Sequence, residues 1–370
     1  MKKFFVKVLG NEKYQSFSIP VFAILLSLIV GAVVIAVLGK NPLSAYANLL
    51  QGSGILPKPS YAGGKSMLTD FMSFVNYWTP MIFAALAVAV ALKAGLFNIG
   101  ISGQMLAAGF VATVTVGYSG LAAPIAKPLV ALIAFVVGGI VGALIGWLKY
   151  KFNINEVVSS IMINYIIQYV VAFIINTKYV DPVSRQSKNI SEAARQTLMN
   201  MQIGAFKYDI PLGFILAFIA VFVIKFIFDK TTFGYELKAV GANRKAAKYA
   251  GINVGKNMIT SMLISGSLAG LAGATYYLGY FSSMQPKVLA AMGYDSIAVA
   301  LLGNSNPVGI LFSSFLISIM GKGSTYMSST AGLDSEIASV ITGLILLFSA
   351  CSVFIQHLVK KAKDKMEVNK

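Results

Sequence analysis

The sequence predicts an all-α integral membrane protein with about ten transmembrane helices, some of them short or broken, and with both termini in the cytoplasm. Composition is the first observation behind this prediction: 57% of the 370 residues are hydrophobic and only 12% are charged. A soluble domain carries about 25% charged residues, because its surface has to be wetted. The second observation is that stretches without Asp, Glu, Lys or Arg recur along the chain, and about 20 apolar residues cross a bilayer as a helix.

The uncharged stretches mark the candidate spans. They cover residues 19–39, 71–92, 94–126, 128–148, 157–177, 210–224, 257–286, 296–321 and 337–359. The stretch 296–321 holds a Gly-Asn-Ser-Asn-Pro sequence at 303–307, and proline and its neighbours break a helix. We therefore expect two short spans there that meet at a polar hairpin, which raises the total to ten. The first stretch is longer than the core of a signal peptide, so we expect it to be a span.

Basic residues near both termini predict the orientation. Lysines stand near the two ends at Lys2, Lys3, Lys7, Lys13, Lys360, Lys361, Lys363, Lys365 and Lys370. Cytoplasmic segments of membrane proteins carry an excess of Lys and Arg, so both ends should be cytoplasmic and the number of spans even. The same bias accounts for the formal net charge of +17 without nucleic acid as a partner.

Polar residues and glycines interrupt the second and third spans. Gly95, Asn98, Gly100, Gly103 and Gln104 lie within ten residues between two apolar stretches. One interpretation is a broken helix that faces a substrate path, because irregular backbone at membrane depth is tolerated where it lines a cavity or is buried in protein. The other interpretation is a tight cytoplasmic turn between two spans, and the spacing alone leaves both open.

Further polar residues fall inside spans. Ser160, Asn164 and Gln168 are four residues apart and share one helix face, which must look into the protein or a water path because polar side chains are costly in lipid. Acidic residues are few within spans: Asp295 lies near the outer end of one span and Glu156 near the inner end of another.

Small residues also recur at helical spacing. The positions are Gly138, Gly142 and Gly146 in one span, and Gly266, Gly270 and Ala274 in another. Small residues four apart form a flat stripe on which two helix backbones approach closely. We expect these stripes to serve packing.

Motifs for chemistry are missing from the sequence. The stretch Gly63-Gly64-Lys65-Ser66 resembles the end of a phosphate-binding loop, but Pro59 stands where that loop needs its first glycine. One Cys and one His exclude a disulfide framework and a Cys/His zinc site. The sequence therefore predicts no catalytic residue, no metal site and no cofactor in this chain. If ATP drives transport, a partner has to hydrolyse it.

The stretch 231–253 lies between two spans on the cytoplasmic side. Residues Arg244 to Ala250 favour a short helix rich in Ala and Lys, which Gly251 ends as a cap. Such a helix between long spans is suited to dock into a groove of a cytoplasmic partner. The alternative is an ordinary basic loop.

Four stretches together resemble one family. The sequence 234–251, GYELKAVGANRKAAKYAG, resembles the coupling-helix motif of bacterial ABC importer permeases that handle branched-chain amino acids, ribose-type sugars and nucleosides. The sequence 97–104, FNIGISGQ, resembles that family's FNIGAEGQ, and 155–165 and 293–303 resemble further signatures, particularly of its nucleoside branch. The chain departs from the family at Ser102, where the motif has an acidic residue.

The resemblance implies a transport subunit without ATPase activity of its own, in the bacterial cytoplasmic membrane. It implies a second permease subunit, a cytoplasmic ATPase that binds ATP and Mg²⁺, and an extracellular substrate-binding lipoprotein. It also implies one transmembrane domain over residues 1–370, with a cytoplasmic coupling segment at 229–256 and extracellular loops at 40–70 and 178–209. The predicted contacts to the ATPase are Glu236, Gly241, Ala246, Ala247 and Gly251.

The predicted cargo is a neutral nucleoside, which suits a polar but largely uncharged path. The predicted path residues are Asn98, Gln104, Asn164, Gln168, Phe97 and Asp295, and Phe97 or Tyr165 is a candidate to stack on a base. Two alternatives stay open: the same kind of permease for ribose-like sugars or another small polar solute, and a secondary transporter driven by an ion gradient.

Overall fold

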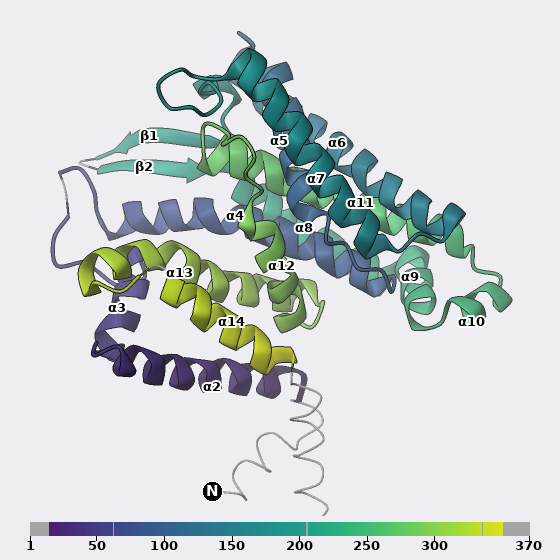
Figure 1. Cartoon of the computed structure of the whole chain (residues 1–370), viewed down its shortest axis with the longest axis horizontal. Coiled ribbons are helices and arrows are strands. Elements are labelled where there is room, and N and C mark those ends of the chain that lie inside the picture. Colours follow the sequence, from purple (N-terminus) through teal and green to yellow (C-terminus); the bar gives the residue numbers. More distant parts are fainter. Residues whose placement is uncertain (1–14, 62, 205, 335, 351–370) are drawn as a thin grey trace, which may run out of the picture.

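The computed structural model describes residues 15–61, 63–204, 206–334 and 336–350, and these form a bundle of packed helices with one small β-hairpin (Figure 1). The helices are α2 (Gln15–Val37), α3 (Pro42–Gly52), α4 (Met67–Lys93), α5 (Ile101–Ala112), α6 (Ala123–Phe152), α7 (Glu156–Ile174), α8 (Leu212–Lys230), α9 (Thr232–Ala242), α10 (Arg244–Tyr249), α11 (Val254–Thr275), α12 (Ala291–Leu302), α13 (Pro307–Ala331) and α14 (Glu336–Ala350). Three helices end in a π-helical turn: η1 (Thr113–Gly117) after α5, η2 (Ile175–Tyr179) after α7 and η4 (Tyr276–Tyr280) after α11.

Within the described residues, six helices are long and apolar enough to cross a membrane: α4, α6, α7 with η2, α8, α11 with η4, and α13. A seventh crossing is formed if α2 and α3, which meet at an angle of 115°, count as one bent span. Three shorter apolar helices cover Ile101–Gly117, Ala291–Leu302 and Glu336–Ile345. These ten correspond one to one to the expected spans, so the predicted class of a helical membrane protein with short or broken helices is confirmed.

The predicted break after Leu302 is also confirmed. Helix α12 ends at Leu302 and α13 begins at Pro307, with the Asn306 side chain accepting a hydrogen bond from the backbone N–H of Val308 at 3.0 Å. Asn304 and Ser305 have positive φ angles of 52° and 49°, a conformation that short polar residues tolerate in turns. The proline fits because the first helical position needs no N–H donor.

The helical fold also contains one short β-hairpin that the sequence did not predict. The loop between α7 and α8 holds a short 3₁₀ turn, η3 (Glu192–Ala194), and an antiparallel hairpin of β1 (Thr197–Ile203) and β2 (Phe206–Pro211). Gly204, with a φ of +65°, lies in the turn that joins the strands. Charge counting could not find these strands, because a hairpin at the membrane surface tolerates polar residues on its exposed side.

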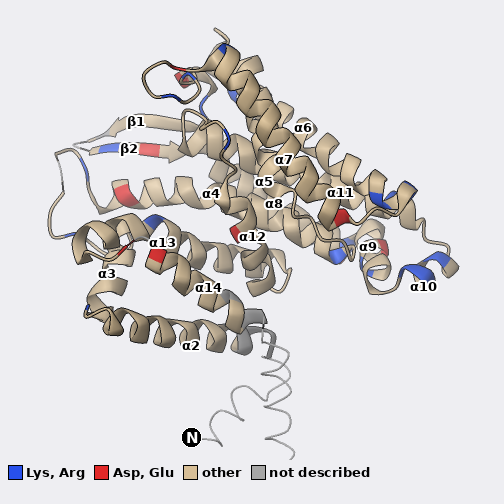
Figure 2. Cartoon of the chain, viewed as in Figure 1, with Lys and Arg blue, Asp and Glu red and all other residues tan. Residues whose placement is uncertain are grey.

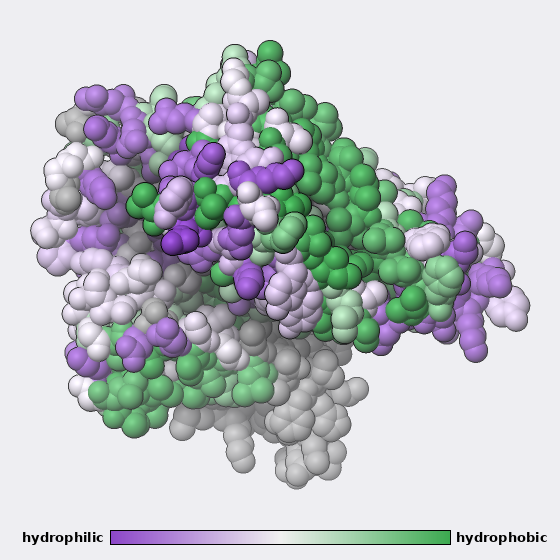
Figure 3. All heavy atoms as spheres, turned by 45° about the horizontal axis from the view of Figure 1, so that its top comes forward, coloured by the Kyte–Doolittle hydropathy of each residue, from purple (hydrophilic) through white to green (hydrophobic). Residues whose placement is uncertain are grey.

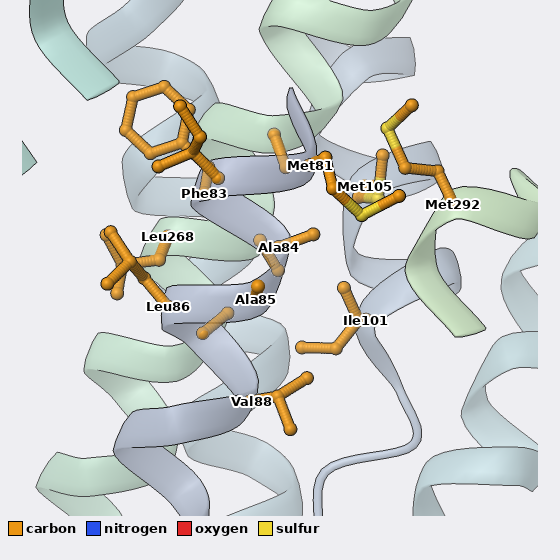
Figure 4. Close-up of a cluster of buried hydrophobic side chains, with 14 of the residues drawn as sticks. Met81, Phe83, Ala84, Ala85, Leu86, Val88, Ile101, Met105, Leu268 and Met292 are labelled. Atoms are coloured by element: carbon orange, nitrogen blue, oxygen red, sulfur yellow. The ribbon is translucent and has the colours of Figure 1, made fainter. Parts of the chain in front are cut away.

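Helix α4 forms the centre of the bundle, and 89% of its most apolar stretch of 18 residues is buried inside the protein. Figure 4 shows side chains from Met81 to Val88 of α4 packed against α5, α11 and α12, including Met105, Leu268 and Met292. Alanine recurs along this helix, and its small side chain allows other helices to pack closely on all sides. A helix that is apolar on every face is expected in the interior.

The predicted glycine stripes lie against each other. A Cβ atom built on Gly138 would collide with the backbone carbonyl of Gly266 and lie 2.7 Å from the Cα of Gly270, and one on Gly142 would lie 2.9 Å from the Cα of Gly266. Helices α6 and α11 therefore touch through their backbones. We call this contact, formed by Gly138, Gly142, Gly266 and Gly270, the glycine seam.

The outer surface has the apolar band that contact with a lipid bilayer requires. Large apolar side chains are exposed on the outward faces of α6, α7 and α8, among them Ile140 at 64%, Phe173 at 69% and Ile215 at 62%. Figure 3 shows this hydrophobic surface between two hydrophilic ends, and Figure 2 shows charged residues gathered mainly toward those ends. The chain is therefore built to cross a membrane several times.

The two ends of the bundle differ. One end carries α9 and α10, and we call it the α10 end; the other carries η4 and the β-hairpin, and we call it the hairpin end (Figure 1). Helix α2 begins and α14 ends toward the α10 end, so both lead to the same side of the bundle, as the even number of spans requires. The basic residues before α2 and after α14 lie outside the described residues.

Candidate functional site

The chain between α4 and α5 is a buried, non-helical segment. Helix α4 ends at Lys93, Gly95 takes a φ of +67°, and the next helix begins only at Ile101. Leu96 and Asn98 are each 1% exposed. The segment is therefore a largely buried connection between two separate helices, α4 and α5, and its place on a substrate path stays a prediction. We call residues 94–100 the broken segment.

Hydrogen bonds from buried side chains hold this segment in place. The Asn98 amide nitrogen donates to the Gln104 carbonyl oxygen at 3.1 Å and to Ser265 Oγ at 2.9 Å, and the Gln104 amide nitrogen donates back to Asn98 Oδ1 at 3.2 Å. Asn98 Oδ1 also accepts from the backbone N–H of Gly100 at 2.9 Å. The two amides therefore satisfy each other in this conformation, and their contact with a substrate stays a prediction.

Asn164 of α7 fixes the beginning of α5 from the other side. Its Oδ1 accepts a hydrogen bond from the backbone N–H of Gly103 at 3.0 Å, and its Nδ2 donates to the carbonyl of Ile99 at 3.0 Å. Gly103 has to be small here, because a Cβ would lie 2.9 Å from the Cα of Asn164. Asn164 is therefore a positioning residue for the broken segment in this conformation.

Ser102 replaces the acidic residue of the family motif, and its surroundings leave little room for a longer side chain. Its hydroxyl donates to the carbonyl of Ala290 at 2.9 Å, and a Cβ on Gly293 would lie 2.9 Å from the Cα of Ser102. The serine thus joins α5 to the beginning of α12.

The remaining predicted path residues are spread around the bundle. Gln168 donates to the carbonyl of Lys287 at 2.6 Å, Phe97 is half-buried beside Asn98, and Tyr165 is 54% exposed on the outer face of α7. Asp295 lies apart from all of these, on α12. The structure therefore brings together Asn98, Gln104 and Asn164, with Phe97 beside them, and it separates them from Asp295.

Asp295 lines a cavity of about 170 Å³ between α4, α12, α13 and α14. The wall also contains Tyr77 and Met81 from α4, Met320 and Ser324 from α13, and Thr342 from α14. Pairs of conformations that open and close such a space are usual in transporters. The cavity combines one carboxylate with an aromatic ring and hydroxyl groups, which can hold a polar, uncharged solute.

A lysine and a further tyrosine lie next to Tyr77, which lines this cavity. Lys322 Nζ donates to the hydroxyl of Tyr280 at 3.0 Å and lies 4.8 Å from the centre of its ring. The Tyr280 ring in turn packs edge-on against Tyr77, with the ring centres 5.2 Å apart. Charged groups inside membrane helices mark substrate paths more often than packing.

The sequence missed Lys322 and Tyr77. Lys322 follows the uncharged stretch 296–321, so the sequence predicts that the span ends there. In the structure, α13 continues to Ala331. Tyr77 was one of 17 tyrosines with no spacing to distinguish it. The feature that could have identified Tyr77 is its position in α4, just before the alanine-rich part of this buried helix.

The predicted coupling segment folds as two short helices. Asn243 caps α10 by accepting hydrogen bonds from the N–H groups of Lys245 and Ala246 at 3.0 and 3.1 Å, and Gly251 follows the helix with a φ of +81°. Ala247 is buried, while Ala246 and Tyr249 are exposed. The helix and its glycine end are as predicted, and α10 turns one face outward.

The coupling segment touches the broken segment directly. The Arg244 guanidinium donates to the carbonyl of Gly95 at 2.8 Å, and a Cβ on Gly241 would collide with the carbonyl of Lys93. Glu236 accepts from the Asn257 amide at 2.7 Å, which ties α9 to the start of α11. A displacement of α10 therefore acts first on the turn that precedes α5.

Within the part of the chain that the structure describes, no three His, Cys, Asp or Glu residues lie close enough to hold a metal ion. The comparisons with known proteins agree with the geometry. Residues 71–350 match the family described as branched-chain amino acid transport system / permease component.

The chain belongs to this permease family. The permease is 37% identical over 350 residues to a guanosine ABC transporter permease protein of Bacillus subtilis, covering 94% of this chain and 97% of the relative. It is 34% identical to a nucleoside ABC transporter permease protein of Lactococcus lactis, covering 95% and 96%. A glucose ABC transporter permease protein of Haloferax volcanii is 26% identical, covering 93% and 90%. No solved structure matches the permease significantly. Members of the family are membrane permease subunits and not enzymes themselves.

Proposed function

We propose that this permease carries nucleosides into the cell as the membrane subunit of an ATP-driven importer. The observation that carries this proposal is the near full-length similarity to the guanosine and nucleoside permeases, together with a cavity whose chemistry fits that cargo. A nucleoside has a flat base that packs against aromatic rings and sugar hydroxyls that donate to a carboxylate. Tyr77 and Asp295 offer these two partners in one cavity.

The α10 end faces the cytoplasm in this proposal and binds a separate ATPase, which holds ATP and Mg²⁺. The support is the exposed face of α10 with Ala246 and Tyr249, flanked by Lys245 and Lys248. A short helix that presents small and aromatic side chains suits a groove on a partner. Of the other predicted contacts, Glu236, Gly241 and Ala247 face the bundle and join the segment to it, whereas Gly251 is exposed at the end of α10.

ATP binding by the partner shifts the permease between two conformations, since a partner changes an equilibrium only through unequal affinity for two states. The contacts of Arg244 and Gly241 with the turn at 93–95 provide the route from α10 into the membrane. Movement of that turn shifts the start of α5, which Asn98, Gln104 and Asn164 hold through hydrogen bonds. Whether those three amides exchange their partners for substrate is part of the proposal.

The hairpin end faces outward and receives the cargo from an extracellular substrate-binding lipoprotein. The loops at 40–70 and 178–209 supply this surface, through α3 and the β1–β2 hairpin. A second permease subunit completes the membrane part, and the whole chain acts as one transmembrane domain in the bacterial cytoplasmic membrane.

Uptake of radiolabelled guanosine by cells that express the complete transporter tests the proposal. We expect Ala246→Arg to abolish uptake, because a long charged side chain on the exposed face of α10 blocks the ATPase groove. Lys151→Ala, which changes an exposed charge at the end of the neighbouring α6, is the matched control and should leave uptake unchanged. Unlabelled guanosine should compete for uptake, and unlabelled ribose should not.

Two results contradict the proposal. Accumulation of guanosine by the chain alone in liposomes, under a proton or sodium gradient and without nucleotide, identifies a secondary transporter. Competition by ribose but not by guanosine identifies a sugar permease.

A further inference from the structure

A second cavity of about 170 Å³ lies at the hairpin end, beyond the last turn of α11. Tyr276 and Tyr277 of η4 and Phe281 line it on one side, and Gln186, Ser283 and Gln285 line it from the loops. Aromatic rings and amide side chains thus meet in one enclosed space. The cavity shares none of its lining residues with the Asp295 cavity.

The hydroxyl group of Tyr277 is the unusual feature of this cavity. Tyr277 is 5% exposed, and its hydroxyl has no hydrogen-bond partner among the residues that the structure describes. Ala290 also lines the cavity, and no described residue accepts the hydroxyl proton. A buried polar group without a partner costs about 1–3 kcal/mol, so the group is suited to a ligand that supplies the missing acceptor.

The aromatic rings around Tyr277 are held at fixed angles. The Tyr276 and Tyr277 ring centres are 4.9 Å apart at 88°, and those of Tyr276 and Phe281 are 5.0 Å apart at 66°. Both pairs are edge-to-face, so neither buries two ring faces in a parallel stack. This arrangement leaves aromatic faces for a flat guest.

The loops close the cavity through hydrogen bonds. Ser187 and Met284 exchange two bonds of 2.9 Å, and the Ser283 hydroxyl pairs with the Gln186 carbonyl oxygen at 2.5 Å. That contact orients the Gln186 amide, whose NH₂ group is a donor. Gln285 adds a second amide that can both donate and accept.

The geometry points to an outer binding site for the base of a nucleoside in this cavity, with the Tyr277 hydroxyl donating to an acceptor on the base. The inference rests on the proposed function and adds a site to it. A cavity of roughly 150 Å³ suffices for one benzene ring, whereas pockets for drug-sized ligands measure about 300–1,000 Å³. The space therefore suits the ring system alone, with the sugar at the mouth.

Tyr276 links this outer site to the Asp295 cavity. It lines the outer site and packs against Phe281, whose ring centre lies 4.8 Å from that of Tyr280. The next aromatic residue along η4, Tyr280, already packs on Tyr77 of the inner cavity. A base that leaves the outer site therefore meets aromatic rings continuously on its way to Asp295.

Photo-crosslinking of the purified full-length chain tests the site directly. 8-Azidoguanosine is the probe, and mass spectrometry locates the crosslinked peptide. We expect a crosslink within residues 276–290 that excess guanosine suppresses and excess ribose does not. Crosslinks confined to other segments overturn the inference. A suppressible crosslink at 276–290 in a chain whose complete transporter does not import guanosine supports the site and contradicts the proposed function instead.

Uptake kinetics of the complete transporter give a second, independent readout. Tyr277→Phe removes only the hydroxyl, and we expect it to raise the KM for guanosine about two- to tenfold with an unchanged maximal rate, which is the effect of one neutral hydrogen bond. Gln285→Ala should act in the same direction. Tyr169→Phe, at a residue of α7 that is 60% exposed, is the matched control. Normal guanosine import with an unchanged KM in both Tyr277→Phe and Gln285→Ala overturns the inference.

Discussion

The helices on the two sides of the central helix α4 are packed differently. On the α6–α11 side, backbones meet directly at the glycine seam. On the α12–α13–α14 side, α4 borders a cavity of about 170 Å³ that holds Asp295 and Tyr77. Close backbone contact resists change of shape, because a packed interior is not continuously deformable. We therefore expect the tightly packed side to act as a fixed support and the cavity side to be where the permease opens.

The broken segment between α4 and α5 lies where the two sides are joined. Asn98 bonds to Ser265 of α11, which belongs to the tightly packed side, while Gly95 accepts from Arg244 at the start of α10. A force applied at α10 therefore bends the chain relative to a support that does not move.

Gly266→Leu is expected to prevent stable folding. A side chain there collides with the carbonyl of Gly138 and the backbone of Gly142, and overpacking of a well-packed interface costs about 1–3 kcal/mol or more. The amount of monodisperse protein after detergent extraction measures the effect. Gly120→Ala is the control, because nothing lies within 4 Å of the added Cβ. Equal yields for both variants would mean that the seam is not a close contact.

Asp295→Asn is expected to reduce guanosine uptake by tenfold or more while the protein remains folded. A hydrogen bond to a charged group contributes about 1.5–3 kcal/mol, and about 1.4 kcal/mol corresponds to a factor of ten. Transport assays with equal amounts of protein in the membrane measure the change. The matched variant is Ser267→Ala on the tightly packed side, which should transport normally. Similar losses in both would remove the distinction between the two sides.

Arg244→Ala is expected to separate ATP hydrolysis from transport. The variant loses the bond to the Gly95 carbonyl, so α10 still binds the ATPase but moves the turn before α5 less effectively. We expect uptake to fall about two- to tenfold per ATP hydrolysed. Lys245→Ala, at the adjacent exposed position, is the control. Unchanged coupling in Arg244→Ala would show that the force enters the bundle elsewhere, for example through Glu236 and Asn257.

Ser265→Ala is expected to have the smallest effect. Its hydroxyl accepts from Asn98 and donates to the carbonyl of Ala87 at 2.7 Å, and each neutral hydrogen bond contributes about 0.5–1.5 kcal/mol. Asn98 keeps its bond to Gln104, so a modest fall in melting temperature is expected with transport largely intact. A loss of transport as large as that of Asp295→Asn would place the path at the broken segment instead.

Local features of this fold followed from the sequence. The break at Pro307, the helix end at Gly251 and the seam of glycines spaced four apart could be predicted. Each of these features depends on only a few neighbouring residues. The hairpin between α7 and α8 did not follow, since short strands in a polar loop leave no mark in a count of charges. The sequence predicts the end of a span at Lys322. It could not show that α13 continues further, because contacts with neighbouring helices determine the length of that helix.

The candidate site followed less well, because it depends on contacts between distant parts of the chain. The sequence identified Asn164 as a polar residue that must face inward, and it left Asn98 and Gln104 either in a broken helix or in a cytoplasmic turn. Spacing could not reveal that the first two bond to each other and the third to the backbone of α5. Tyr77, Tyr280 and Lys322 come from three elements, and only the fold brings them together.

Thiol labelling of single-cysteine variants tests the two-sided account most directly. The one native cysteine, Cys351, is first replaced by serine, and a cysteine is then introduced at Ser324 in the Asp295 cavity or at Ser267 beside the glycine seam. The account predicts that a small water-soluble reagent labels Ser324→Cys in the complete transporter, that guanosine slows this labelling, and that Ser267→Cys stays unlabelled. Labelling of Ser267→Cys that guanosine slows, with Ser324→Cys unaffected by guanosine, would contradict the account.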